Sequence, residues 1–119
     1  MAAPDDATRD LLISAYAAFN ARDIDGALAT MDPHVAWPNG MEGGYVHGHE
    51  GVREYWTRQW QLIDPHVEPL RFATEASGHA VVDVHQVVRD RSGTVVGDQM
   101  VQHAYVIVAG LITRMEIRK

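Results

Sequence analysis

The chain has 119 residues and a mass of 13.2 kDa, which is the size of one domain. It carries 10 basic and 16 acidic side chains, a formal net charge of −6, and no Lys/Arg cluster suited to nucleic acid or an anionic membrane. No apolar run approaches the roughly 18 residues of a membrane-spanning helix. Cysteine is absent, which excludes disulfides and thiolate metal sites. We therefore expect a single domain over 1–119.

The first third of the chain predicts two helices. Leu12 and Tyr16 belong to a broad apolar face with helical spacing. Asp23 offers a capping side chain for a second, short helix over 24–31, which Pro33 would end because it lacks a backbone N–H. The acidic start resembles neither a secretory signal nor a transit peptide, so a cytoplasmic location is the default expectation.

The middle of the chain predicts a loop followed by a third helix. A short extended piece over 34–37 leads into 38–51, which is rich in glycine and reads as a loop or flap. From Val52 onward, apolar and aromatic residues including Trp56 recur at helical spacing, and Pro65 closes the segment. We expect helices first and strands second.

The second half is rich in β-branched residues and predicts a sheet. Turn residues separate four expected strands, at about 67–75, 80–90, 94–108 and 111–118. Three consecutive hairpins make an antiparallel meander, and Gly97 is the natural place for a bulge in the longest strand. Amphipathic helices covering one face of such a sheet give an α+β architecture.

Three stretches together carry a family resemblance: 16–26 (YAAFNARDIDG), 48–56 (GHEGVREYW) and 110–117 (GLITRMEI). In this order and spacing they resemble the SnoaL-like branch of the nuclear-transport-factor-two-like superfamily, which has a cystatin-like fold. The resemblance implies a cone in which three N-terminal helices pack on a curved antiparallel sheet around one deep pocket. It also implies a homodimer formed through the outer face of the sheet.

Members of that superfamily include isomerases, cyclases, hydrolases, dehydratases and non-catalytic binders, so fold analogy does not choose among them. Ketosteroid isomerases of this fold use an aspartate base with a tyrosine and a protonated acid as donors. In a match along FNARDIDG, their tyrosine falls on Ala15, their aspartate on Trp37 and their acid on His103. Limonene-epoxide-hydrolase-like members need an Asp-Arg-Asp arrangement; Asp83 is present, without an arginine two residues before it.

Titratable residues on the expected strands suggest a catalytic group. A four-residue turn that pairs Asp90 with Thr94 places on one face Asp83, His85, Gln99 and His103. Imidazole titrates near about pH 6.5, so we expect His85 and His103 to handle protons, with Asp83 as orienting group. The alternative is that this face is a solvated or dimer surface, because a one-residue slip sends the set to the other side.

The remaining candidate ligand-binding residues are mostly aromatic. A similar register across the last turn pairs Tyr105 with Met115 and makes the surrounding wall apolar. The full set is Tyr16, Phe19, Trp37, Asn39, Trp56, Trp60, Gln99, Tyr105 and Met115. Most aromatics on helical faces are simply core, whereas those facing a cavity would form its wall. The loop after Trp37, which carries Asn39, is a candidate rim or lid.

The sequence favours neither a metal nor a cofactor. His47-x-His49, followed by Glu50, permits a metal interpretation, but the spacing is not specific and suits a loop that enters a helix. Neither a G-x-G-x-x-G nor a G-x-x-x-x-G-K-[ST] phosphate-binding motif occurs.

The function that these observations favour is binding or transformation of a small, mostly apolar organic molecule. If it is catalytic, we expect His/Asp proton transfer of the isomerase, dehydratase or hydrolase type. A non-catalytic domain that binds a ligand or a protein partner is the alternative, and an orphan domain without a single substrate is a third. Imidazoles that titrate abnormally inside a closed cavity would favour the catalyst.

Overall fold

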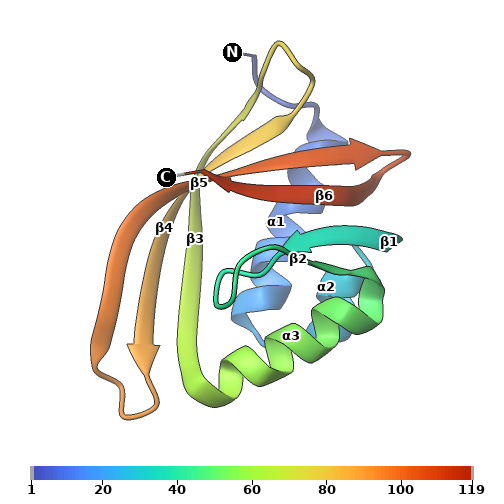
Figure 1. The fold of residues 1–119 in the computed structure, drawn as a ribbon. Coiled ribbons are helices and arrows are strands. Elements are labelled where there is room, and N and C mark those ends of the chain that lie inside the picture. Colours follow the sequence, from blue (N-terminus) through green and yellow to red (C-terminus); the bar gives the residue numbers. More distant parts are fainter. Residues whose placement is uncertain (1, 119) are drawn as a thin grey trace.

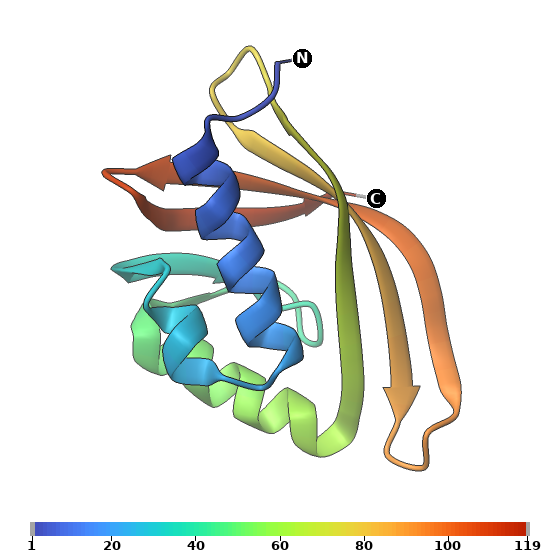
Figure 2. The same ribbon diagram turned by 180° about the vertical axis from the view of Figure 1, so that it is seen from behind.

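The protein is described over residues 2–118 by a computed structural model (Figure 1). The elements in chain order are α1 (Asp6–Asn20), α2 (Ile24–Leu28), β1 (Met31–Pro38), β2 (Tyr45–His47), α3 (Gly48–Leu62), β3 (Ile63–Thr74), β4 (Ala80–Asp90), β5 (Val95–Val108) and β6 (Leu111–Arg118). The strands form one sheet in the order β2-β1-β6-β5-β4-β3. The sheet curves around the helices, which lie on its concave side (Figures 1 and 2). The expected α+β class and curved sheet are confirmed.

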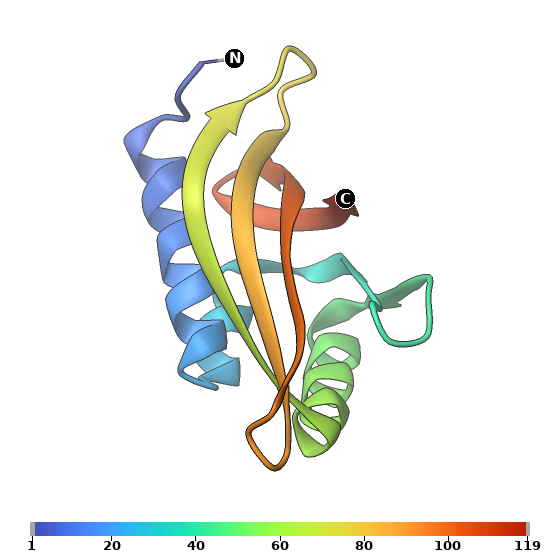
Figure 3. The same cartoon turned by 90° about the vertical axis from the view of Figure 1, so that its left-hand side faces the viewer.

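Helices α1 and α3 cover different parts of the concave face. Figure 3 looks onto the outside of the long strands β3, β4 and β5, with α1 behind one edge and α3 behind the other. The Asp5 side chain caps α1 by accepting a hydrogen bond from the Thr8 N–H at 2.7 Å. The inner faces of α1 and α3 bury, among others, Leu12 and Trp56. None of the described helices is long and apolar enough to cross a membrane.

The chain differs from the expected order of helices before strands. Helix α2 ends at Leu28, and Met31 begins a strand instead of closing the helix. This strand, β1, pairs parallel to β6 with Met31 opposite Ile112, and the Ile112 N–H donates to the Thr30 carbonyl at 2.9 Å. The sheet is therefore mixed rather than purely antiparallel. Long-range pairing to β6 overrides the local helical spacing of this segment.

The boundary between α3 and β3 also differs from the expectation. Strand β3 begins at Ile63, before Pro65, and runs through both Pro65 and Pro69. Proline cannot donate to a β ladder and is confined to edge strands and bulges. Since β3 is the edge of the sheet, and a register shift lies between Pro69 and Arg71, both prolines are accommodated.

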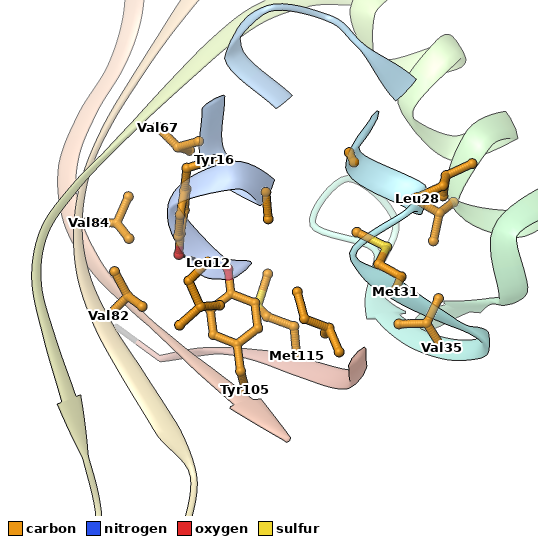
Figure 4. Packing of buried hydrophobic residues seen from close by; sticks show 14 of the residues in the cluster. Leu12, Tyr16, Leu28, Met31, Val35, Val67, Val82, Val84, Tyr105 and Met115 are labelled. Carbon is orange, nitrogen blue, oxygen red and sulfur yellow. Dashed lines mark hydrogen bonds between the residues drawn. The ribbon is translucent and has the colours of Figure 1, made fainter. Parts of the chain in front are cut away.

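The core occupies the concave side of the sheet (Figure 4). Leu12 and Tyr16 of α1 point toward Val82 and Val84 of β4, and Tyr105 of β5 approaches them from below. All five side chains are buried. This packing fixes the position of α1 against the sheet, and Tyr16 and Tyr105 of the packed group also line a cavity.

Candidate functional site

A cavity lies between the concave face of the sheet and helices α1 and α3. The space between protein atoms, with the open solvent at its mouth included, is about 650 Å³. The helices contribute Ala15, Tyr16, Phe19, Tyr55, Trp56 and Gln59. The strands contribute, among others, Trp37, Val67, Gln86, His103, Tyr105 and Met115. No Asp, Glu, Lys or Arg is among the described lining residues.

Aromatic rings form much of the wall. The Trp56 ring meets Phe19 and Trp37 edge-on, with centroid distances of 5.1 and 5.6 Å. Such edge contacts hold large apolar rings in fixed orientations. The wall is therefore a preformed apolar surface against which a small organic molecule can pack.

A hydrogen-bond chain of three buried side chains reaches this wall. Tyr105 donates from its hydroxyl to the Tyr16 hydroxyl at 2.8 Å, and the Tyr16 hydroxyl lies 2.7 Å from Nδ1 of His103. The Tyr16 and Tyr105 hydroxyls meet at the centre of the core (Figure 4). Tyr16 accepts from Tyr105, and its own proton has no acceptor among the described residues other than Nδ1 of His103, so the assignment that pairs this proton has Tyr16 donate to Nδ1. The imidazole therefore carries its proton on Nε2.

Burial keeps all three groups neutral. Desolvation lowers the pKa of His103 from 6.5 to about 4. Desolvation also raises the pKa of Tyr105 and, together with the neighbouring Tyr105, raises the pKa of Tyr16 well above 10.0. Nε2 of His103 has no partner among the described residues, and His103 lines the cavity. Near neutral pH the hydrogen-bond chain thus ends in an uncharged N–H donor on a residue that lines the cavity.

A tyrosine hydroxyl is present in the cavity, although the match to ketosteroid isomerases places an alanine at their tyrosine position. That match put the tyrosine position on Ala15, and both Ala15 and Tyr16 line the cavity. The Tyr16 ring lies parallel to the His103 ring, with an interplanar angle of 6°. The neighbouring residue therefore places a hydroxyl against the imidazole.

The expected grouping of Asp83 and His85 with His103 is wrong. Next to the turn, β4 and β5 pair Arg89 with Val95 as expected, but the register then shifts by one residue. Beyond this bulge Val82 lies opposite His103, on the inner face of the sheet. Because side chains alternate between the two faces of a strand, Asp83 and His85 lie on the outer face. The extra residue of the bulge is Val96, next to Gly97, and local periodicity gives no sign of it.

On the outer face, Asp83 and His85 have partners of their own. Asp83 accepts a hydrogen bond from Gln102 at 3.1 Å, and Nε2 of His85 lies 2.7 Å from the Asp98 carboxylate. These pairs are partly exposed and stand across the sheet from the cavity. Neither residue can act with His103 on one ligand.

Three expected ligand-binding residues lie outside the cavity wall. Gln99 is on the inner face, opposite Gln86, but it is exposed, and Gln86 lines the cavity in its place. Trp60 packs on Phe19 and Trp56 behind the wall. Asn39 organises the loop instead, since its side-chain oxygen accepts from the N–H groups of residues 41 and 42. The structure places in the wall Tyr16, Phe19, Trp37, Trp56, Tyr105 and Met115.

Gln59 and Tyr55 are wall residues absent from the expected set. Gln59 donates to the Tyr55 hydroxyl at 3.0 Å, and that hydroxyl also accepts from the Gly40 N–H at 3.0 Å. Desolvation raises the pKa of Tyr55. The signal for Gln59 was present in the sequence, because it lies four residues after Tyr55, a polar side chain within an apolar stripe.

Within residues 2–118, no group of three or more His, Cys, Asp or Glu side chains is arranged to hold a metal ion. His49, which had invited a metal interpretation with His47, places Nε2 2.9 Å from the Met31 carbonyl. His47 is the residue before α3 and supplies no side-chain cap.

Solved structures of other proteins and one family model match this chain. No curated protein matches. The solved structure of TerC, co-crystallised with polyporic acid, is 28% identical with a TM-score of 0.83 and covers 94% of this chain and 90% of its own. An NTF2-like protein of unknown function from Burkholderia pseudomallei K96243 is 25% identical with a TM-score of 0.83, over 96% and 91% of the two chains.

An uncharacterised cystatin-fold protein from Novosphingobium aromaticivorans shares the fold at 19% identity, with a TM-score of 0.77 over 94% and 97% of the two chains. The sequence of residues 13–115, most of the chain, matches the SnoaL-like domain. The chain belongs to the SnoaL-like domain family.

Proposed function

We propose that this protein binds a small, uncharged and mostly apolar organic molecule in the cavity, and that His103 donates a hydrogen bond to an acceptor oxygen of that molecule. The observation that carries the proposal is the chain from Tyr105 through Tyr16 to His103. Each donor in such a chain is polarised by the one behind it, which strengthens the last N–H. The donor is thereby fixed before a ligand arrives.

The lining supports an uncharged ligand. An ion transferred from water into an apolar wall loses its hydration, and the described lining offers no opposite charge in return. A neutral molecule avoids this penalty and gains burial free energy against the aromatic rings. TerC, a protein of the same fold at 28% identity, was co-crystallised with polyporic acid, which is consistent with an organic ligand.

Proton-transfer chemistry is a second candidate, favoured by the same chain. An N–H aimed at a carbonyl oxygen stabilises the negative charge that develops there during enolisation or attack by water. The described lining holds no carboxylate to orient the imidazole, the role expected of Asp83. The Asp83 part of the His/Asp mechanism is therefore not retained, and binding is the function that the geometry supports best.

The proposal is tested with 2-acetylnaphthalene, an uncharged aromatic ketone, and 2-naphthoate, its anionic counterpart, by isothermal titration calorimetry. We expect the ketone to bind, the carboxylate to bind at least tenfold more weakly, and His103→Phe to weaken ketone binding about tenfold by removing one hydrogen bond. His103→Gln retains an acceptor for Tyr16 and a donor for the ligand, so it should preserve most of the affinity.

His85→Gln is the matched control, because this histidine lies on the same sheet but on the outer face. Its ketone affinity should equal that of the wild type. Preference for the carboxylate, or full affinity in His103→Phe, would refute the proposal.

A further inference from the structure

Gln86 interrupts an apolar row on the inner face of β4. Side chains alternate between the two faces of a strand, so Gln86 shares the inner face with Val82, Val84 and Val88. Val82 and Val84 are fully buried and lie on the concave side, facing Tyr16 (Figure 4). A β-branched residue suits such a position better than glutamine does. The amide at this point in the row therefore calls for a physical explanation.

The amide of Gln86 is open to the cavity. Gln86 lies opposite Val67 of β3, and both residues line the cavity. Gln86 is partly exposed, and its amide has no hydrogen-bond partner among the described residues. The unpaired side-chain atoms that are fully buried in the described part of the chain belong to Gln59 and Trp60. Both the donor and the acceptor of the Gln86 amide are therefore free and accessible.

The strand register places Gln86 relative to His103. Val82 lies directly opposite His103, and Gln86 follows Val82 by four residues along the same strand. At the rise of a β-strand this separation is about 13 Å, and both side chains point into the concave side. Between them lie Val84 and its cross-strand partner Val101, which are both buried. The sheet thus offers two hydrogen-bonding groups with an apolar strip between them.

This spacing sets the size and the chemistry of a ligand that reaches both groups. Two hydrogen bonds of about 2.9 Å take up part of the separation and leave roughly 7 Å between the polar atoms of the ligand, the length of a fused-ring body. Since the Gln86 amide has a free donor and a free acceptor, a hydroxyl can pair with either of them. The described lining carries no charge, so the molecule is uncharged.

We propose that Gln86 is a specificity-determining residue, and that the ligand is an uncharged fused-ring hydroxy ketone whose carbonyl is held by His103 and whose hydroxyl is held by Gln86. This inference rests on the proposed function of the cavity, and deepens it by naming the group that reads the other end of the ligand. A ketone without the hydroxyl leaves the Gln86 amide without a partner in the ligand.

The first test needs no ligand. Gln86→Val removes the amide without removing a hydrogen bond of the fold, and valine has the higher strand preference. We expect its Tm in calorimetry to equal or exceed that of the wild type. A lower Tm would mean that the amide serves the fold, and would overturn the inference.

The second test compares 2-acetyl-6-hydroxynaphthalene with 2-acetylnaphthalene, which has the same skeleton and the same ketone but no hydroxyl. Near neutral pH the phenolic hydroxyl is uncharged. By calorimetric titration, the wild type should bind the hydroxy ketone about fivefold more tightly, the gain from one hydrogen bond, and Gln86→Val should lack this preference. Equal binding of the two compounds by the wild type, or a preference that survives in Gln86→Val, would overturn the inference.

Gln99→Val is the matched control for the second test. Gln99 lies directly opposite Gln86 on the same face, but it is exposed and outside the cavity wall. This variant should keep the fivefold preference for the hydroxy ketone. Loss of the preference in Gln99→Val to the same extent as in Gln86→Val would show that Gln86 is not the residue that selects the hydroxyl.

Failure of this inference is separable from failure of the proposed function. If binding of 2-acetylnaphthalene falls in His103→Phe but the hydroxyl brings no gain that depends on Gln86, the cavity function stands and only the role of Gln86 is refuted. If His103→Phe weakens the binding of neither compound, both proposals fall.

Discussion

At the scale of the residue, burial of one imidazole determines how the protein responds to acid. His103 is 6% exposed and accepts from Tyr16, a bond that requires an unprotonated Nδ1. Protonation would set a charge in an apolar wall and remove that acceptor. The same burial that keeps the donor on Nε2 near neutral pH therefore makes the site sensitive to acid.

We predict a loss of stability between about pH 6.5 and about pH 4 that depends on His103. Burial lowers its pKa to about 4 in the folded protein, whereas the unfolded chain binds the proton near 6.5. The unfolded state therefore takes up the proton first, and the free energy of unfolding falls by about 3 kcal/mol as the pH falls through this window. Urea denaturation of wild type and His103→Gln at pH 7, 5.5 and 4.5 measures the difference.

The His103→Gln variant should lack this part of the acid sensitivity, because glutamine does not titrate. His66→Gln, at an exposed position, is the control and should follow the wild type. Parallel pH profiles for wild type and His103→Gln would show that His103 is not the group responsible.

At the scale of the element, α1 is joined to the edge strand by an amide that mimics a β-strand partner. The Asn20 side chain donates to the Val67 carbonyl at 2.7 Å and accepts from the Val67 N–H at 3.0 Å. On the same edge of β3, Thr74 forms an isolated bridge with Ala2, and the Pro65 carbonyl accepts from Arg22. Val67 itself lines the cavity. The contact thus covers the edge of the sheet and positions one wall of the site.

We predict that Asn20→Ala lowers the free energy of unfolding by about 2 kcal/mol, although alanine is the better helix former. Asn20→Asp should be at least as damaging near neutral pH, because a carboxylate oxygen would then face the Val67 carbonyl. Chemical denaturation measures both. Wild-type stability in either variant would contradict the role assigned to this amide.

At the scale of the whole molecule, the outer face of the sheet is the surface through which we expect two copies of the chain to associate. The homodimer through this face stays a prediction. Polar pairs such as His85 with Asp98 surround Met100, which is 56% exposed and lies opposite His85. An exposed methionine within a polar surround is a suitable centre for a two-fold contact.

We predict that the chain elutes in light-scattering chromatography at twice its 13.2 kDa mass, and that Met100→Glu shifts it to the monomer. A charge placed at the centre of a two-fold contact meets its own copy and repels it. Val108→Glu is the matched control, since Val108 is 57% exposed but lies at the far end of β5. A monomeric wild type, or an equal response of the two variants, would refute the predicted interface.

Local patterns in the sequence were sufficient for much of the fold. The apolar spacing that includes Leu12 and Trp56 located two helices, and the β-branched runs located β4 to β6, because a side-chain period is a property of neighbouring residues. The pairing of Met115 with Tyr105 was also predicted correctly, although a register shift between Val106 and Ile107 separates this pair from the turn.

Tertiary structure alone decided what the cavity contains. One bulged residue near Gly97 sends Asp83 and His85 outward and leaves His103 inside, and no periodicity records such a slip. The contact of Tyr16 with His103 joins residues 87 positions apart. The sequence by itself determined which side chains were available for chemistry. Which of them meet was decided by cross-strand pairing and helix packing, because these contacts join residues that are far apart in the chain.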